Sequence, residues 1–146
     1  MRILMLGATG QIGYALVDAL SRTEHDVSVM VRNAPEPKFP DNVRVVCYPE
    51  FSADAFRAAM RGADHVVYGI GLPEQFTFDP EIFERVNCAL LATFLEELRK
   101  SEIRSLTYVS TYEVFENVDN RIDDRCGAEP GAAADASTDD RASAAA

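Results

Sequence analysis

An α/β fold with a doubly wound parallel sheet is predicted by two features of the sequence. An apolar strand at residues 1–6 runs into a glycine-rich turn and then into an amphipathic helix. Apolar strands then alternate with helical segments up to about residue 110. No window approaches ~18 consecutive apolar residues, so a membrane span is not expected. Right-handed crossovers between parallel strands predict the strand order 3-2-1-4-5.

The first turn reads Gly7-Ala-Thr-Gly10-Gln-Ile-Gly13. Gly7 can adopt the backbone angles of a tight turn, and Gly10 has no Cβ to block a phosphate that approaches the backbone. Gly13 lets the helix pack closely on the strand, and the first amides of that helix favour an anion. This spacing after a strand predicts a dinucleotide site. The competing interpretation is an ordinary strand-to-helix turn that is rich in glycine.

The remaining elements follow from apolar patterning and capping residues. Ser52 and Asp79 are predicted N-caps, and Gly62 is a predicted helix stop. We expect the sheet to be incomplete after its fifth strand, which leaves an open edge where a homodimer could form. The predicted strands lie at 26–31, 43–47, 63–70 and 105–110, and the predicted helices at 53–61 and 80–100.

Composition divides the chain into two parts. Residues 1–122 form the predicted domain, whereas residues 123–146 contain no Val, Leu, Ile, Met, Phe, Tyr or Trp and are expected to be an acidic, alanine-rich disordered tail. The formal net charge of −10 argues against a nucleic-acid partner. Three dispersed cysteines in a chain that begins directly with a strand predict a cytoplasmic protein. His25 and His65 lack ligand spacing, so no metal site is expected.

Three motifs in order resemble one known family. They are the glycine turn, Asn87 within Val86-Asn-Cys, and the stretch Tyr108-Val-Ser-Thr-Tyr-Glu-Val-Phe115. Over about residues 1–118 the chain resembles the extended and atypical short-chain dehydrogenase/reductases, which are NAD-dependent epimerases and dehydratases with a Rossmann-like, NAD(P)-binding fold. The resemblance implies a dinucleotide cofactor and hydride chemistry at a sugar nucleotide or a similar alcohol.

The resemblance also implies roles for individual residues. Thr111 would hydrogen-bond the substrate carbonyl or alcohol, and Glu113 would act as an acid or base. The competing interpretations are a strand-end hydroxyl that bonds the local backbone and a solvated charge. Asn87 would lie near the cofactor. The remaining cofactor-binding residues are Gly7, Gly10, Gln11, Ile12 and Gly13 around the pyrophosphate, and Gly69, Ile70 and Gly71 on the ribose and nicotinamide side.

Arg32 bears on the choice of cofactor. It follows the second strand, where NAD-selective proteins place an acidic residue that accepts a hydrogen bond from the ribose 2′-OH. A guanidinium group would instead bind a 2′-phosphate. The sequence therefore predicts NADP, with NAD as the alternative, and the competing interpretation of Arg32 is a surface arginine at a strand end.

The chain departs from the family in its catalytic pair. The family uses a Tyr followed four residues later by a Lys, but the last Tyr here is Tyr112 and the last Lys is Lys100. Two explanations are open. One is a non-catalytic protein that senses NAD(P) and signals to a partner. The other is an enzyme related to oxidoreductases and isomerases whose coding sequence is truncated or frame-shifted after Ile122, and the sequence identifies no substrate for it.

Overall fold

The computed structural model describes residues 1–33, 38–73 and 79–110. Contacts divide the chain into two units, Met1–Val109 and Ser110–Ala146. The first unit contains all the helices and strands described below. The predicted tail at 123–146 lies outside the described residues, and so does the boundary at residue 122.

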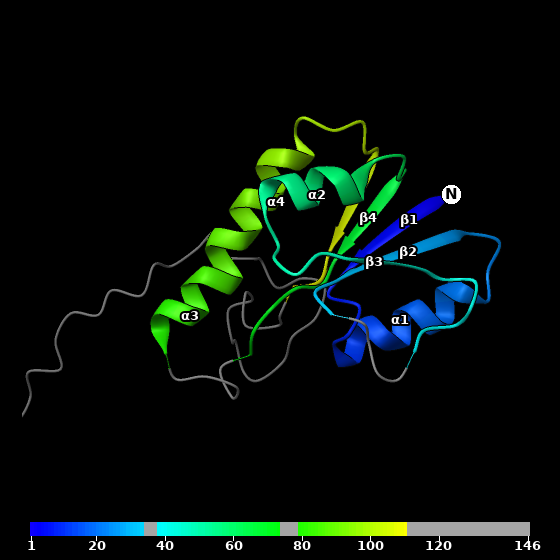
Figure 1. Cartoon of the computed structure of the whole chain (residues 1–146), viewed down its shortest axis with the longest axis horizontal. Coiled ribbons are helices and arrows are strands. Elements are labelled where there is room, and N and C mark those ends of the chain that lie inside the picture. Colours follow the sequence, from blue (N-terminus) through cyan, green and yellow to red (C-terminus); the bar gives the residue numbers. More distant parts are fainter. Residues whose placement is uncertain (34–37, 74–78, 111–146) are drawn as a thin grey trace, which may run out of the picture. The chain divides into compact units, whose positions relative to one another are not determined.

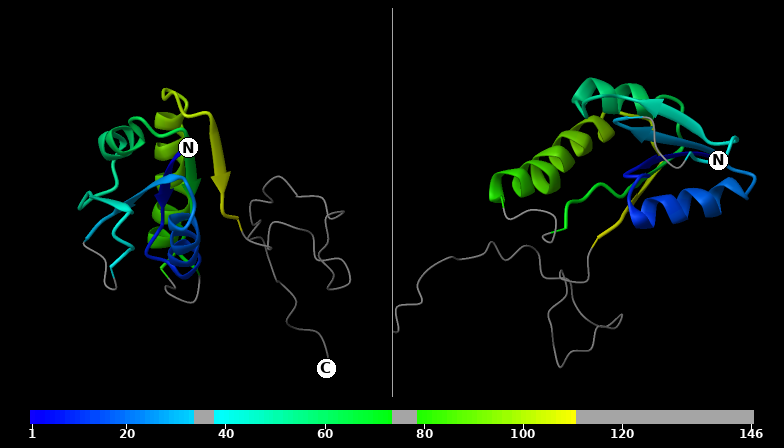
Figure 2. Two further views of the ribbon diagram at one scale, coloured as in Figure 1. Left: turned by 90° about the vertical axis from the view of Figure 1, so that its right-hand side faces the viewer. Right: turned by 60° about the horizontal axis from the view of Figure 1, so that its bottom comes forward.

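The first unit is built on a five-stranded parallel sheet with the order β3-β2-β1-β4-β5. This order confirms the predicted fold class and topology, and Figure 2 shows β5 at one edge of the sheet. Because β1 lies at the centre, Leu4 is paired with Ser28 on one side and with Val66 on the other. The strands are β1 (Arg2–Leu6), β2 (Asp26–Val31), β3 (Arg44–Cys47), β4 (His65–Tyr68) and β5 (Ser105–Tyr108).

Helices cover both faces of this sheet (Figure 1). Side chains alternate between the two faces along each strand, so β1 contributes to two separate cores. On one face Ile3 and Met5 pack with Val17 of the first helix. On the other face Leu4 and Leu6 pack with the aromatic side chains Phe56 and Phe94. The covering helices are α1 (Gln11–Ser21) on the first face and α2 (Ala53–Met60) and α4 (Leu90–Leu98) on the second.

The predicted helix boundaries are set by the expected caps. The Ser52 hydroxyl accepts a hydrogen bond from the Ala55 amide at 3.3 Å. Gly62 follows the end of α2 and has a φ of +76°. The Asp79 carboxylate accepts from the Glu81 amide at 2.9 Å. These contacts confirm the capping roles of Ser52 and Asp79 and the stop at Gly62.

Two strands are shorter than predicted by two or more residues. β4 covers only His65–Tyr68 of the predicted 63–70, and β5 ends at Tyr108 instead of residue 110. Strand structure requires a shared hydrogen-bond ladder, and β4 pairs with both β1 and β5 only over those four residues. Gly69, which lies within the predicted strand, and Gly71 belong to the loop that follows β4.

The helix predicted at 80–100 is present over residues 80–98, but it is not a continuous α-helix. It consists of α3 (Pro80–Glu84), a π-helical turn η2 (Arg85–Ala89) and α4 (Leu90–Leu98). A π-helical turn inserts one extra residue per turn and commonly marks a functional position. Here the turn contains Asn87, one of the residues assigned to the site.

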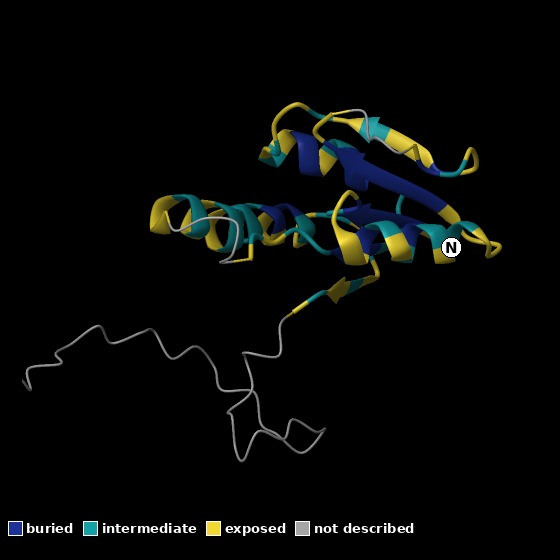
Figure 3. Cartoon of the chain, turned by 90° about the horizontal axis from the view of Figure 1, so that it is seen from below, coloured by how far each residue is buried: buried dark blue, intermediate teal, exposed yellow. Residues whose placement is uncertain are grey.

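Burial falls from the centre of the sheet to the β5 edge, as Figure 3 shows in dark blue, teal and yellow. All side chains of β2 except Asp26 are buried. Tyr108 on β5 is 48% exposed. Among the described residues, no helix is long and apolar enough to span a membrane.

Candidate functional site

The glycine-rich turn after β1 has a geometry that requires glycine at two positions. Gly7 adopts a φ of +81°, and a Cβ at this position would overlap the backbone carbonyl of Gly69. A Cβ on Gly13 would overlap the carbonyl oxygen of Gly7. A Cβ on Gly10 would meet only that same oxygen, at 3.4 Å. Packing therefore requires Gly7 and Gly13, whereas Gly10 borders open space.

Helix α1 begins without a side-chain cap. Its N-cap is Gly10, which has no side chain to accept a hydrogen bond from the first turn. The Tyr14 amide donates to the Gly10 carbonyl at 2.8 Å and closes the first helical ring. The amides of Gln11, Ile12 and Gly13 come before this ring and have no partner within the helix. Gln11 and Ile12 are exposed, whereas Gly13 is buried, so the positive end of the helix dipole reaches the surface at the first two of these residues.

The loop after β4 passes directly beside this turn. The Gly69 amide donates to the Leu6 carbonyl at 2.9 Å. A Cβ on Gly69 would lie 3.3 Å from the Leu6 oxygen, so the two backbones are in close contact. The carboxyl ends of β1 and β4 thus lie together, at the edge where doubly wound sheets bind ligands.

Asn87 holds the next part of the loop. Its side-chain Oδ1 accepts a hydrogen bond from the Leu72 amide at 2.7 Å, and its Nδ2 donates to the Leu72 carbonyl at 3.0 Å. Oδ1 also lies 3.9 Å from the position of a Cβ on Gly71. Asn87 therefore binds the backbone of the loop that carries Gly69, Ile70 and Gly71, which is a positioning role.

Arg32 lies at the same edge of the sheet. It directly follows β2, whose last residue Val31 accepts a hydrogen bond from the Tyr48 amide at 2.8 Å. The Arg32 side chain is exposed. It makes no ion pair or side-chain hydrogen bond within the described part of the chain, so its guanidinium group is available to a ligand.

The structure thus brings most of the predicted site residues to the carboxyl edge of the sheet. The glycine turn, the loop after β4, Asn87 and Arg32 all lie there. The two predicted catalytic residues, Thr111 and Glu113, lie outside the described residues.

Tyr68 is a feature of this region that the sequence analysis did not identify. It is the last residue of β4 and is 1% exposed. Its ring lies 4.8 Å from that of Phe94 and 5.9 Å from that of Tyr108, measured between centroids. The phenol oxygen is buried and has no hydrogen-bond partner among the described residues. Burial, together with the neighbouring Tyr108, raises the pKa of Tyr68 to about 12.

A signal for Tyr68 is present in the sequence. A phenol follows two valines at the end of the strand and comes immediately before a glycine. A buried phenol normally finds a partner for its hydroxyl. The missing partner can only be recognised in three dimensions, because it depends on the aromatic side chains of α4 and β5.

The fold and the glycine turn define a Rossmann-type nucleotide-binding domain. The sequence pattern of the NAD(P)H-binding family matches residues 7–144, so the chain belongs to that family. Among the residues in this match are the glycine turn, Arg32 and Asn87.

Solved structures of sugar-converting enzymes share the fold. Uronate dehydrogenase from Agrobacterium tumefaciens has a TM-score of 0.64 at 22% identity, over 78% of this chain and 42% of that protein. The UDP-Glc/GlcNAc 4-epimerase from Campylobacter jejuni has a TM-score of 0.72 at 13% identity, over 88% of this chain and 43% of the epimerase.

A curated relative is a reductase. The 3-diazoavenalumate denitrifying reductase of a Streptomyces species is 41% identical over 63 residues, which make up 43% of this chain and 20% of the reductase. The chain therefore spans less than half the length of each of these three proteins. The family match confirms the predicted NAD(P)-binding domain, and the solved structures share its fold.

Proposed function

We propose that this domain binds NADP through the turn between β1 and α1, as the cofactor-binding part of an oxidoreductase or isomerase. The observation that carries the proposal is the uncapped start of α1. Three adjacent amides, those of Gln11, Ile12 and Gly13, have no partner within the helix, and Gly10 leaves space beside them. A pyrophosphate group supplies the acceptor oxygens and the negative charge that suit such a helix end.

The ribose and nicotinamide would lie along the loop after β4. Gly69 and Gly71 present backbone without side chains at this point, and Ile70 offers an apolar contact. Asn87 supports the arrangement because its two hydrogen bonds to Leu72 hold the loop in place. A cofactor bound here would supply hydride transfer, while the chain supplies its position.

The preference for NADP rests on Arg32. Its exposed guanidinium group can donate two parallel hydrogen bonds to a phosphate, and a phosphate is present on the 2′ position of NADP alone. One neighbouring structure, a uronate dehydrogenase variant, is a complex with NAD, so the fold by itself does not select NADP. The choice between them is therefore a property of the residues after β2.

The substrate class is proposed from the neighbours. A uronate dehydrogenase and a UDP-sugar epimerase share the fold, which supports chemistry at a sugar or sugar-nucleotide alcohol. In this proposal Thr111 hydrogen-bonds the reacting oxygen and Glu113 transfers a proton. Residues 1–122 would form the binding domain and residues 123–146 a disordered tail, in a cytoplasmic protein that pairs through the β5 edge.

A second candidate function is binding without turnover, as in a sensor of the NADP pool. It is favoured by the sequence itself, which contains no Tyr-x-x-x-Lys pair. The two functions share the cofactor site and differ in whether a substrate is converted. Incubation with NADPH and a panel of sugar-derived carbonyl compounds identifies an oxidoreductase, which oxidises the cofactor and lowers its absorbance. Incubation with a sugar nucleotide, followed by analysis of the sugar, identifies an isomerase, which leaves the cofactor unchanged overall, and a sensor gives neither result.

Cofactor selectivity is tested by calorimetric titration with NADPH and NADH. We expect NADPH to bind about tenfold or more tightly than NADH, since one charge-assisted phosphate contact is worth about 1.5–3 kcal/mol. Arg32→Ala should remove this preference and leave NADH binding unchanged. Arg99→Ala, an exposed arginine at the end of α4, is the matched control. Tighter binding of NADH by the unmodified protein would refute the role of Arg32.

A further inference from the structure

A second polar hollow lies at the opposite edge of the sheet, where the strands begin. It has a volume of about 400 Å³, within the range of small-molecule sites. Its walls come from the starts of β1, β2 and β3 and from the turn between α2 and β4, and include Arg2, Arg44 and Arg61. β1 is five residues long, so at about 3.3 Å per residue this hollow lies about 15 Å from the glycine turn. It is therefore separate from the proposed cofactor site.

The hydrogen bonds of the lining residues show which groups are free. The Ser28 hydroxyl donates to the Ile3 carbonyl at 3.2 Å, and the Asn42 amide donates to the Ser21 carbonyl at 2.7 Å. Both of these donors are already used in hydrogen bonds within the protein. Arg44 and Arg61, in contrast, make no ion pair or side-chain hydrogen bond to any described residue.

Arg2 is held in a fixed orientation. Its guanidinium group donates to the Asp64 carboxylate at 2.9 Å, and its backbone amide donates to the same carboxylate. These bonds lower the pKa of Asp64 and raise that of Arg2, and Asp26 on the rim raises the Arg2 pKa further. Asp64 is thus paired with Arg2, whereas Arg44 forms no ion pair with any described residue.

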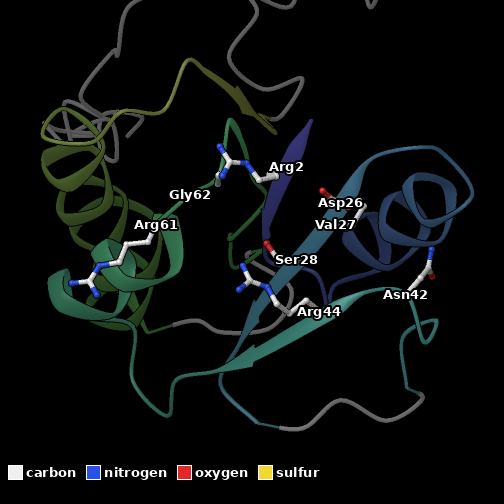
Figure 4. Close-up of a pocket in the computed structure, with 9 residues that line it drawn as sticks. Arg2, Asp26, Val27, Ser28, Asn42, Arg44, Arg61 and Gly62 are labelled. Atoms are coloured by element: carbon white, nitrogen blue, oxygen red, sulfur yellow. The ribbon is translucent and has the colours of Figure 1, made fainter.

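Figure 4 shows how the three arginines are arranged. The guanidinium groups of Arg2 and Arg44 point toward the middle of the hollow, and that of Arg61 is turned outward. The three cations outnumber the two carboxylates, Asp26 and Asp64, in a chain whose formal net charge is −10. A local excess of positive charge on an acidic protein attracts small anions.

We propose that this hollow, at the amino edge of the sheet, binds a small anion that carries two linked phosphate groups, through Arg44 with Arg2 and Arg61. A guanidinium fork matches two oxygens of one phosphate. Arg44 binds one phosphate from within the hollow, and Arg61 turns inward to bind the second. Arg2 remains paired with Asp64 and contributes its remaining donors.

Titration of the full chain with inorganic pyrophosphate, followed by amide chemical shifts, tests this proposal. We expect saturable shifts at Ser28, Arg44 and Gly62, which persist when NADPH is present. Shifts confined to residues 8–13 would show that pyrophosphate binds only the glycine turn and would overturn the proposal. The absence of saturable shifts would overturn it as well.

Two variants and one control assign the binding to the arginines. Arg44→Ala should weaken pyrophosphate binding about tenfold or more, and Arg61→Ala should weaken it less. Arg22→Ala removes an arginine that pairs with Asp18 on α1 and does not line the hollow, and it should leave pyrophosphate binding unchanged. Equal affinity in Arg44→Ala and the unmodified protein would contradict the proposal.

Discussion

Asn87 and Leu72 are joined by two hydrogen bonds, one from the Leu72 amide to Oδ1 at 2.7 Å and one from Nδ2 to the Leu72 carbonyl at 3.0 Å. The side-chain amide thus pairs with the loop backbone in the way that a neighbouring strand would. Because Asn87 lies in a π-helical turn, a local feature of the helix fixes the loop beside the glycine turn.

Replacement of Asn87 by Ala removes both bonds. We expect the Leu72 amide to exchange with solvent faster and the dissociation constant for NADPH to rise about tenfold, since two neutral hydrogen bonds contribute about 1 kcal/mol each. Hydrogen exchange and calorimetry measure the two effects. Asn42→Ala, which removes one bond to Ser21 on the other side of the fold, is the control. An unchanged Leu72 exchange rate in Asn87→Ala would contradict the positioning role.

The contrast between Gly10 and Gly13 gives a second prediction. Gly13→Ala should destabilise the fold by about 1–3 kcal/mol, because the new Cβ would overlap the Gly7 carbonyl. Gly10→Ala has space for its Cβ and an ordinary φ of −76°, so its effect on stability should be below about 1 kcal/mol. Urea unfolding compares the two variants. Equal losses of stability would show that the turn is packed differently.

Replacement of Tyr68 is expected to stabilise the fold, in contrast to Gly13→Ala. Its buried hydroxyl has no partner among the described residues, so Tyr68→Phe should stabilise the protein by about 1 kcal/mol at neutral pH. A loss of stability in this variant would mean that the hydroxyl has a partner in solution. Phe94→Tyr would test whether the same aromatic cluster tolerates another hydroxyl.

The raised pKa of Tyr68 predicts how stability changes in alkali. The pKa is about 12 in the folded protein and about 10 in an unfolded chain. The neutral phenol therefore favours folding fully below pH 10, and this contribution is lost as the pH rises from about 10 to 12. Unfolding curves at pH 9 and pH 11 should show a larger loss for the unmodified protein than for Tyr68→Phe. Equal losses would contradict the assigned pKa.

The lowered pKa values of Glu97 and Asp64 predict how the stability of the folded protein changes in acid. Lys100 and Arg57 bind the buried Glu97 at 2.7 and 2.8 Å and lower its pKa, and Arg2 lowers the pKa of Asp64. Their stabilising contribution is complete above the unfolded carboxyl pKa of about 4 and is lost as the pH falls below it. Thermal unfolding of Glu97→Gln should therefore depend less on acid than that of the unmodified protein. Asp54→Asn, at an exposed carboxylate on α2, is the control.

The sheet could be predicted from the sequence because each strand carries its own local signal. The mainly apolar stretch at residues 26–31 was predicted as a strand, and β2 has the same bounds in the structure. β4 was predicted too long because Gly69 and Ile70 continue an apolar run. Only the register with β1 and β5 determines that the strand ends at Tyr68.

Part of the site was also predictable, because some of its residues carry a local signal in the sequence. Gly7 and Gly13 are revealed by their spacing after a strand, since a tight turn and close packing leave few other choices. Asn87 was assigned by resemblance, but its bonds to Leu72 connect residues 15 positions apart. No periodic pattern encodes such a contact, nor the π-helical turn around it, because both depend on how the helix packs over the loop.

The start of α1 is proposed to hold the cofactor's pyrophosphate, and a calorimetric titration with NADPH tests this role most directly. Gly10→Val places a branched side chain beside the free amides of Gln11 and Ile12, whereas Ala19→Val adds the same groups on an exposed turn farther along α1. We predict saturable binding to the unmodified protein and to Ala19→Val, and a loss of about tenfold or more in Gly10→Val. Equal binding by all three proteins, with both variants folded, would contradict the claim.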